Sequence, residues 1–203
     1  MEENSSPGET LFDQTHNELR LTVEPGWDEK ISLWYRGVIV TARSIYDYER
    51  LNAIPQDVIK VLSGSIKNIY EIGAGLAELS PQLAKLNLHR CVNIDPLPYR
   101  DVSELLHEAS SKVQTVEGRV KITTLLDRAT IYSNPKCIQQ IGLTLEELYS
   151  LEYERHCKMA DIVIDVRAAT MYSPDLSMVS LLENDWLLNG SFAGVVWQAG
   201  AFS

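Results

Sequence analysis

One stretch of the chain limits the possible folds more than any other: the segment from Asn68 to Ser80, Asn-Ile-Tyr-Glu-Ile-Gly-Ala-Gly-Leu-Ala-Glu-Leu-Ser. Its apolar start predicts a short strand, its glycines predict a tight turn, and the residues after them predict a helix. The segment from Cys91 to Asp95 then predicts a second strand with a carboxylate at its end. Glycines let a ligand approach the backbone closely, and the start of a helix offers free N–H groups. Together the two segments are typical of one half of a nucleotide-type binding site.

The rest of the chain continues this alternation of strands and helices. After the strands at 68–72 and 91–94 and the helix at 76–88, we expect strands at 136–141, 160–166 and 191–198, and helices at 143–158 and 174–188. The intervening residues 98–132 favour two helices, although 122–126 also fits a strand. This pattern predicts an α/β fold with a doubly wound, mostly parallel Rossmann-like sheet, whose ligand site lies at the carboxyl ends of the strands.

The N-terminal part of the chain lacks this alternation. Residues 1–24 show neither helical nor strand periodicity, so we expect a flexible arm. Residues 25–64 favour N-terminal helices, because their apolar side chains recur at steps of three or four residues. The positions that carry this spacing are Trp27, Ile31, Trp34, Val38, Ala42 and Ile45. Residues 65–203 then form the ligand-binding domain.

Composition excludes several classes of function. The net charge of −10 argues against strong non-specific binding to nucleic acid, which depends on Lys and Arg neutralising phosphates. No apolar run approaches the roughly 18 residues that cross a bilayer, so we expect no membrane partner. The cysteines, Cys91, Cys137 and Cys157, are odd in number and lack CxxC spacing, which favours a reducing, cytoplasmic compartment. The histidines show no metal-ligand spacing, so we predict no metal site.

The glycine turn discriminates between ligand classes. A dinucleotide fingerprint needs a small residue at its third glycine position, where this chain has Glu78. A phosphate-binding P-loop needs Gly-Lys-Ser or Gly-Lys-Thr, and the sequence has neither. The pattern Glu71-Ile-Gly73-Ala-Gly75, with Asp95 twenty residues beyond Gly75, resembles motif I and the second-strand acid of class I S-adenosylmethionine-dependent methyltransferases.

This resemblance implies a role for each matching residue. Asp95 would hold the ribose hydroxyls of the cofactor S-adenosylmethionine. Asp165, at the end of the fourth strand, would lie beside the sulfonium and is the one catalytic candidate, as a general base. The cofactor-binding residues implied are Glu71, Gly73, Ala74 and Gly75 for the methionine part, and Pro96 or Leu97, Gly142 and Leu143 for the adenine.

Two further features bear on catalysis. The acid that commonly follows the third strand of these enzymes is absent from Ile141–Thr144, Ile-Gly-Leu-Thr. The regions 160–167 and 188–198 also resemble ribose 2′-O RNA methyltransferases. Asp165 stands at the position of their fourth-strand acid, but Val195 stands at that of their lysine. The lysine matters because a cation there favours deprotonation of the ribose hydroxyl.

We therefore predict an S-adenosylmethionine-dependent methyltransferase whose acceptor is an unidentified small molecule or RNA. Two alternatives stay open: a catalytically silent module of this fold that acts through protein contacts, and a domain of the RNA cap type. Class I methyltransferases usually continue beyond the fifth strand, whereas this chain stops at Ser203, so we expect a sheet without its last two strands. The open edge of the fifth strand is then the expected surface for a protein partner.

Overall fold

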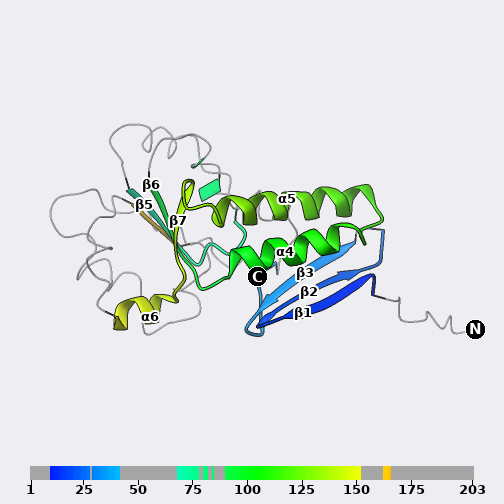
Figure 1. The fold of residues 1–203 in the computed structure, drawn as a ribbon, viewed down its shortest axis with the longest axis horizontal. Helices are drawn as coiled ribbons and strands as arrows, with labels where there is room; N and C mark the ends of the chain where they lie inside the picture. Colours follow the sequence, from blue (N-terminus) through cyan, green and yellow to red (C-terminus); the bar gives the residue numbers. More distant parts are fainter. Residues whose placement is uncertain are drawn as a thin grey trace, which may run out of the picture. The chain divides into compact units, whose positions relative to one another are not determined.

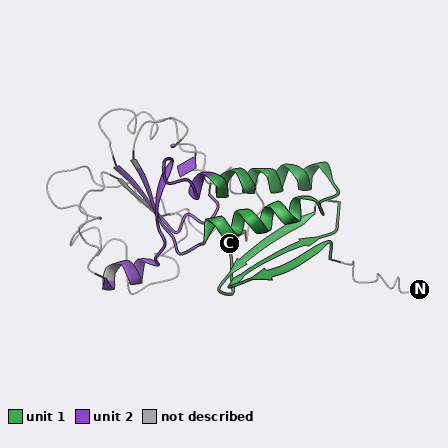
Figure 2. Ribbon diagram, viewed as in Figure 1, with its two compact units in different colours: residues 1–48, 98–130 green, residues 49–97, 131–203 purple. Residues whose placement is uncertain are grey.

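The computed structural model describes residues 10–27, 29–41, 68–77, 80–81, 84, 90–151 and 162–165 (Figure 1). The chain divides into two compact units, each made of two separate pieces of sequence (Figure 2). Unit 1 comprises Met1–Tyr48 and Pro98–Thr130, and unit 2 comprises Glu49–Leu97 and Ile131–Ser203. All the site residues predicted from the sequence fall in unit 2.

Unit 1 contains an antiparallel sheet whose four strands follow one another in chain order. They are β1 (Phe12–His16), β2 (Leu19–Glu24), β3 (Lys30–Tyr35) and β4 (Val38–Ile39). Leu19, Leu21 and Val23 of β2 are fully buried and alternate with polar residues, because one face of the sheet is covered. The β3–β4 turn has positive φ at both Arg36 (+49°) and Gly37 (+78°), the backbone of a tight two-residue hairpin.

The helix α4 (Tyr99–Ser110) covers this sheet and contacts β1 and β2 (Figure 1). Its buried side chains recur at steps of one, three and four residues, so they line one face of the helix. They are Tyr99, Val102, Leu105, Leu106 and Ala109. A longer helix, α5 (Val116–Tyr132), follows. Among the described residues, no helix combines the length and the apolar character needed to cross a membrane.

Glu29 fastens the start of α5 to the turn between β2 and β3. Its carboxylate accepts the backbone N–H groups of Gln114 (2.8 Å) and Thr115 (3.0 Å) and the hydroxyl of Thr115 (2.7 Å). The Thr115 hydroxyl oxygen accepts the N–H of Gly118 (2.9 Å), as an N-cap residue does. Burial alone would raise the pKa of Glu29, but the hydrogen bonds from Thr115 and Gln114 lower it below its ordinary value. The negative charge therefore faces the positive end of the helix dipole.

Unit 2 contains a parallel sheet of four strands. They are β5 (Asn68–Ile72), β6 (Arg90–Ile94), β7 (Ile138–Ile141) and β8 (Ile162–Asp165). Their spatial order is β7-β6-β5-β8, so the first strand in sequence lies between the second and the fourth. This is the order of the first four strands in a Rossmann-type sheet. The consecutive residues Ile69, Tyr70, Glu71 and Ile72 are all buried, as is typical of a parallel strand covered on both faces.

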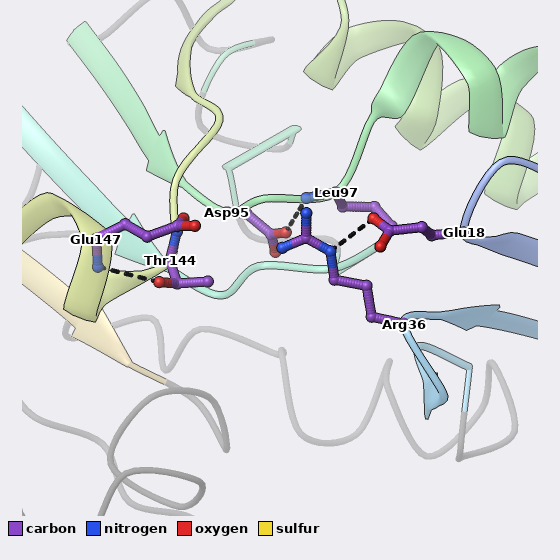
Figure 3. A network of polar contacts seen from close by, with 6 residues as sticks. All are labelled: Glu18, Arg36, Asp95, Leu97, Thr144 and Glu147. Carbon is purple, nitrogen blue, oxygen red and sulfur yellow. Dashed lines mark hydrogen bonds and ion pairs between the residues drawn. The ribbon is translucent and has the colours of Figure 1, made fainter.

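A short helix, α6 (Leu145–Ser150), follows β7 and begins with a reciprocal capping box. The Thr144 hydroxyl oxygen accepts the N–H of Glu147 (3.1 Å; Figure 3). In return, the Glu147 carboxylate accepts the N–H of Thr144 (2.8 Å). The two bonds satisfy two N–H groups that a helix start leaves without partners within the helix. They fix where the chain turns after the end of β7.

Most predictions for the α/β part are confirmed where the structure describes the chain. The strands predicted at 68–72, 91–94 and 136–141 are β5, β6 and β7, with differences of at most two residues at their ends, and β8 lies within the strand predicted at 160–166. Two helices occupy 98–132, so the alternative of a strand at 122–126 is wrong. The described residues of 76–88 include the helical Ser80, Pro81 and Ala84. The predicted helix at 174–188 and the predicted strand at 191–198 lie outside the described residues. So do residues 152–158 of the helix predicted at 143–158.

The predictions for the N-terminal part are wrong in residues 12–39. Strands β1 and β2 lie within residues 1–24, where we expected a flexible arm, and β3 and β4 lie within residues 25–64, where we expected helices. The apolar residues spaced by three or four do not share one buried face: Trp27 is exposed in a turn, whereas Ile31 is buried in β3. Residues 42–67, the remainder of the predicted helical region, lie outside the described residues.

Candidate functional site

The four parallel strands end at the same level of the sheet. Ile72 of β5 is in register with Ile94 of β6 and with Asp165 of β8, and Ile94 is in register with Ile141 of β7. Two backbone hydrogen bonds continue this alignment beyond the strands. Gly73 donates its N–H to the carbonyl of Ile94 (2.8 Å), and Asp95 donates its N–H to the carbonyl of Ile141 (3.1 Å). The predicted site segments are therefore brought together at one edge of the sheet.

The glycine turn after β5 requires glycine at two positions. Gly73 has φ +58° and Gly75 has φ +53°, a backbone region that residues with a Cβ adopt only at a cost. Ala74 between them is buried, as are Leu76 and Ala77 after them, whereas both glycines are half-buried. The side chains of the turn thus pack inward, and its backbone is accessible at the two glycines.

Asp95 joins the glycine turn to the loop after β6. One carboxylate oxygen accepts the N–H of Gly75, and the other accepts the N–H of Leu97, both at 2.7 Å (the bond to Leu97 is drawn in Figure 3). A carboxylate oxygen has two lone pairs and can accept more than one hydrogen bond. Two backbone N–H groups thus hold the Asp95 side chain in one orientation: that of Gly75, twenty residues before it, and that of Leu97, two residues after it.

Gln140 holds the same loop from the side of β7. Its side-chain amide donates to the carbonyl of Leu97 (2.7 Å) and lies within 3.3 Å of the carbonyl of Asp95. Sequence reasoning did not select this residue, because a glutamine within a strand carries no signal for such a contact. Together, Gln140 and the Asp95 carboxylate fix both backbone groups of Leu97.

Glu71 turns its carboxyl group into the protein. It is 2% exposed, and one of its oxygens accepts hydrogen bonds from the hydroxyls of Ser80 and Tyr132, the latter at 3.1 Å. Burial raises the pKa of Glu71, and the negative charge of Asp95 raises it further, while the bonds from Ser80 and Tyr132 act in the opposite direction. Tyr132 is a second residue that the sequence analysis did not select, since it lies 61 residues away along the chain.

The other predicted residues lie around the same strand ends. Pro96 and Leu143 are half-buried, and Gly142 is exposed, with open space where a Cβ would stand. Asp165 is placed through its backbone, which pairs with Ile72 at the end of β8. Within the described part of the chain, no three His, Cys, Asp or Glu side chains come together in a way that would hold a metal ion.

No family model matches this chain, and no curated protein matches it. Among solved structures, the spermidine synthase from Thermotoga maritima matches 76% of this chain and 45% of its own, with a TM-score of 0.41 and 11% identity. A spermidine synthase in complex with the transition state analogue AdoDATO matches 76% of this chain and 46% of its own, with a TM-score of 0.41 and 13% identity. The chain thus spans less than half the length of these structures. Likeness at this level assigns no function, and the assignment of unit 2 to a parallel α/β fold rests on its own strand order.

Proposed function

We propose that the sheet edge formed by Gly73–Gly75, Asp95 and Gly142 binds S-adenosylmethionine, and that the protein transfers its methyl group to an acceptor not yet identified. One observation carries the proposal: the Asp95 carboxylate is bonded to the N–H of Gly75 at the carboxyl ends of adjacent parallel strands. A cofactor with a nucleoside and a charged tail needs two features of the protein close together: an acid that binds the ribose and an open backbone that the tail can approach.

The residues present fit such a cofactor. The two carboxylate oxygens of Asp95 can each accept more than one hydrogen bond, which suits a pair of ribose hydroxyls. The half-buried glycines allow the tail to approach the backbone, and the open space at Gly142 gives room for an adenine beside Pro96 and Leu143. The bound cofactor supplies an already activated methyl group. The protein then has to orient the acceptor and exclude water, with Asp165 at the end of β8 proposed as a general base.

The acceptor class and cellular setting are part of the proposal. We propose a small molecule or an RNA as the acceptor, in the cytoplasm, with the net charge of −10 favouring the small molecule. The rival function, a silent module that acts through protein contacts, is favoured by one observation. The residues after β7 are Gly142, Leu143 and Thr144, without the acid expected to contact the adenine. The proposed partner surface on the fifth strand and Val195 lie outside the described residues.

Calorimetric titration with S-adenosylmethionine and S-adenosylhomocysteine tests the proposal. We expect wild-type binding, and its loss in Gly75→Arg and Asp95→Ala. Gly75→Ala is the matched control for the first variant, because it carries the same backbone strain without the bulk. Asp95→Asn is the control for the second, because it keeps one acceptor oxygen. Both controls should bind more weakly than wild type. Gly75→Ala should still bind at least about tenfold more tightly than Gly75→Arg, and Asp95→Asn at least about tenfold more tightly than Asp95→Ala, a difference of about 1.4 kcal/mol.

The titration also separates the two candidate functions. No binding by a folded wild-type protein would contradict the cofactor site and favour the silent module. Undiminished binding by both Gly75→Arg and Asp95→Ala would place the ligand elsewhere on the molecule. A circular dichroism spectrum of each variant shows whether the fold is kept.

A further inference from the structure

A buried hydroxyl bridges the two sides of the glycine turn. Tyr132, the last residue of α5, is 1% exposed, and its hydroxyl lies 3.1 Å from a carboxylate oxygen of Glu71 and 3.3 Å from the carbonyl oxygen of Ala77. Glu71 precedes Gly73 by two residues, and Ala77 follows Gly75 by two. The hydroxyl therefore contacts the chain just before and just after the turn that contains both glycines.

The turn needs such support because its own backbone restricts it weakly. Gly73 and Gly75 both adopt positive φ, and glycine also populates other regions of the backbone map at little cost. The bond from the Gly75 N–H to Asp95 holds the middle of the turn. The end of the turn is held by the N–H of Ala77, which bonds to Ala74 (2.9 Å), and by the contact of its carbonyl with Tyr132.

The Ser80 hydroxyl shares the same oxygen of Glu71. Ser80, Tyr132 and Glu71 thus form one buried polar cluster beneath the turn, and every member is below 3% exposed. In a buried cluster, removal of one donor leaves its acceptors without compensation, so each hydroxyl matters for the local backbone. None of these side chains reaches the surface where a ligand would lie.

We propose that Tyr132 is a positioning residue for the cofactor turn: its hydroxyl holds the backbone of 73–77 in the binding conformation without touching the ligand. This inference rests on the proposed function, because it assigns the turn a ligand. It extends the site to a residue that neither the glycine pattern nor the strand-end acid indicates. Loss of the hydroxyl should loosen the turn and weaken binding while the rest of unit 2 stays folded.

The first test needs no ligand. Amide hydrogen exchange of the full chain is compared between wild type and Tyr132→Phe, with Tyr99→Phe as the control. Tyr99 is equally buried but belongs to unit 1. We expect roughly tenfold faster exchange at Gly75 and Ala77 in Tyr132→Phe, with unchanged exchange in β5 and β6, and no change at these amides in Tyr99→Phe. Equal exchange at the turn in wild type and Tyr132→Phe would overturn the inference.

The second test measures the dissociation constant for S-adenosylhomocysteine. We expect Tyr132→Phe to bind roughly tenfold more weakly than wild type and Tyr99→Phe to bind like wild type. If wild type binds and Tyr132→Phe binds equally well, the positioning role is wrong although the cofactor site stands. If wild type does not bind, the proposed function fails, and a positioning role for a cofactor fails with it, whatever the exchange result.

A second pair of variants covers the case in which Tyr132→Phe does not fold. Glu71→Met removes the carboxylate and leaves the contact between Tyr132 and Ala77, whereas the double variant Glu71→Met/Tyr132→Phe removes both polar partners together. Replacement of both partners by apolar groups is better tolerated than removal of one. The double variant should show faster exchange at Ala77 than Glu71→Met alone, and equal exchange in the two would overturn the inference.

Discussion

Two buried glutamates have opposite surroundings. At Glu71, burial is the largest influence on the pKa and raises it, and the hydrogen bonds from Ser80 and Tyr132 do not fully offset it. At Glu29, burial is again the largest single influence, but the bonds from Thr115 and Gln114 together outweigh it and lower the pKa. The same side chain type therefore favours the protonated form in one unit and the ionised form in the other. This difference has consequences of opposite sign for stability.

For Glu71, we expect stability to fall as the pH rises. An unfolded glutamate titrates near about pH 4.3. Above that value the unfolded chain loses its proton while the folded chain retains it, so the free energy of unfolding decreases until the pH passes the raised pKa. Glu71→Gln removes this contribution. Urea unfolding between about pH 4 and pH 8 should give a flatter curve for the variant, and parallel curves would contradict the raised pKa.

For Glu29, we expect the reverse. Its lowered pKa stabilises the folded chain above the unfolded value, and this stabilisation is lost as the pH falls through the lowered pKa. Glu29→Gln loses bonds to a charged acceptor, at a cost of about 2 kcal/mol near neutral pH. The difference in free energy of unfolding between wild type and Glu29→Gln should shrink on acidification below about pH 4.3. A difference in free energy of unfolding that is independent of pH would show that the shape of the Glu29 side chain, rather than its charge, stabilises the start of α5.

At the scale of elements, the cap that Glu29 and Thr115 form at the start of α5 limits which residue can stand at position 118. Alanine normally stabilises a helix relative to glycine. A Cβ at position 118, however, would stand 2.1 Å from a carboxylate oxygen of Glu29 and 2.6 Å from Val113. We therefore expect Gly118→Ala to destabilise the protein by about 1–3 kcal/mol, against the helix propensity. Chemical denaturation measures it, with Thr123→Ala on the exposed part of α5 as the control. A gain in stability would mean that Glu29 moves aside easily.

The elements differ in how far the sequence predicts them. β5, β6 and the turn between β5 and its helix were predictable, because an apolar run, two glycines and an acid each have one structural meaning there. The sheet of unit 1 was missed although β2 contains a clear signal, the alternation Leu19, Leu21, Val23 with Arg20 and Thr22 between them. From Trp27 onward, apolar residues at steps of three or four fitted a helix, and β1 has only one buried residue, Phe12, to mark it. Strand pairing, rather than local pattern, decides the structure of such a segment.

At the scale of the whole molecule, a bound cofactor should stabilise the chain and leave a defined footprint. At a concentration one hundred times its Kd, S-adenosylhomocysteine should add about 2.7 kcal/mol to the free energy of unfolding and raise Tm by roughly 5–11 °C for a chain of this size. In hydrogen exchange, protection should appear at 73–75, 95–97 and 142–143, the loops at the strand ends. Protection confined to residues 12–39 would assign the ligand to unit 1 and contradict the site proposed here.

The candidate site was predictable only in its local parts. Gly73, Gly75 and Asp95 were identified because their spacing is fixed by a strand, a turn and a helix. Gln140 and Tyr132 were not, because they reach the site from elements 43 and 61 residues away from their partners. Such contacts depend on strand order and on where a helix ends, and no short-range pattern records either.

The bond between Glu29 and Thr115 has a consequence for the order of events on the ribosome. Its partners are 86 residues apart, and the first part of unit 2 is encoded between them. At about 5–20 residues per second, Thr115 follows Glu29 by roughly 4–17 s. During that time the nascent sheet has no α4 to cover Leu19, Leu21 and Val23, which are buried in the finished protein. The N-terminal strands thus emerge early but wait for residues made much later, and this interval is when the growing chain most needs a chaperone.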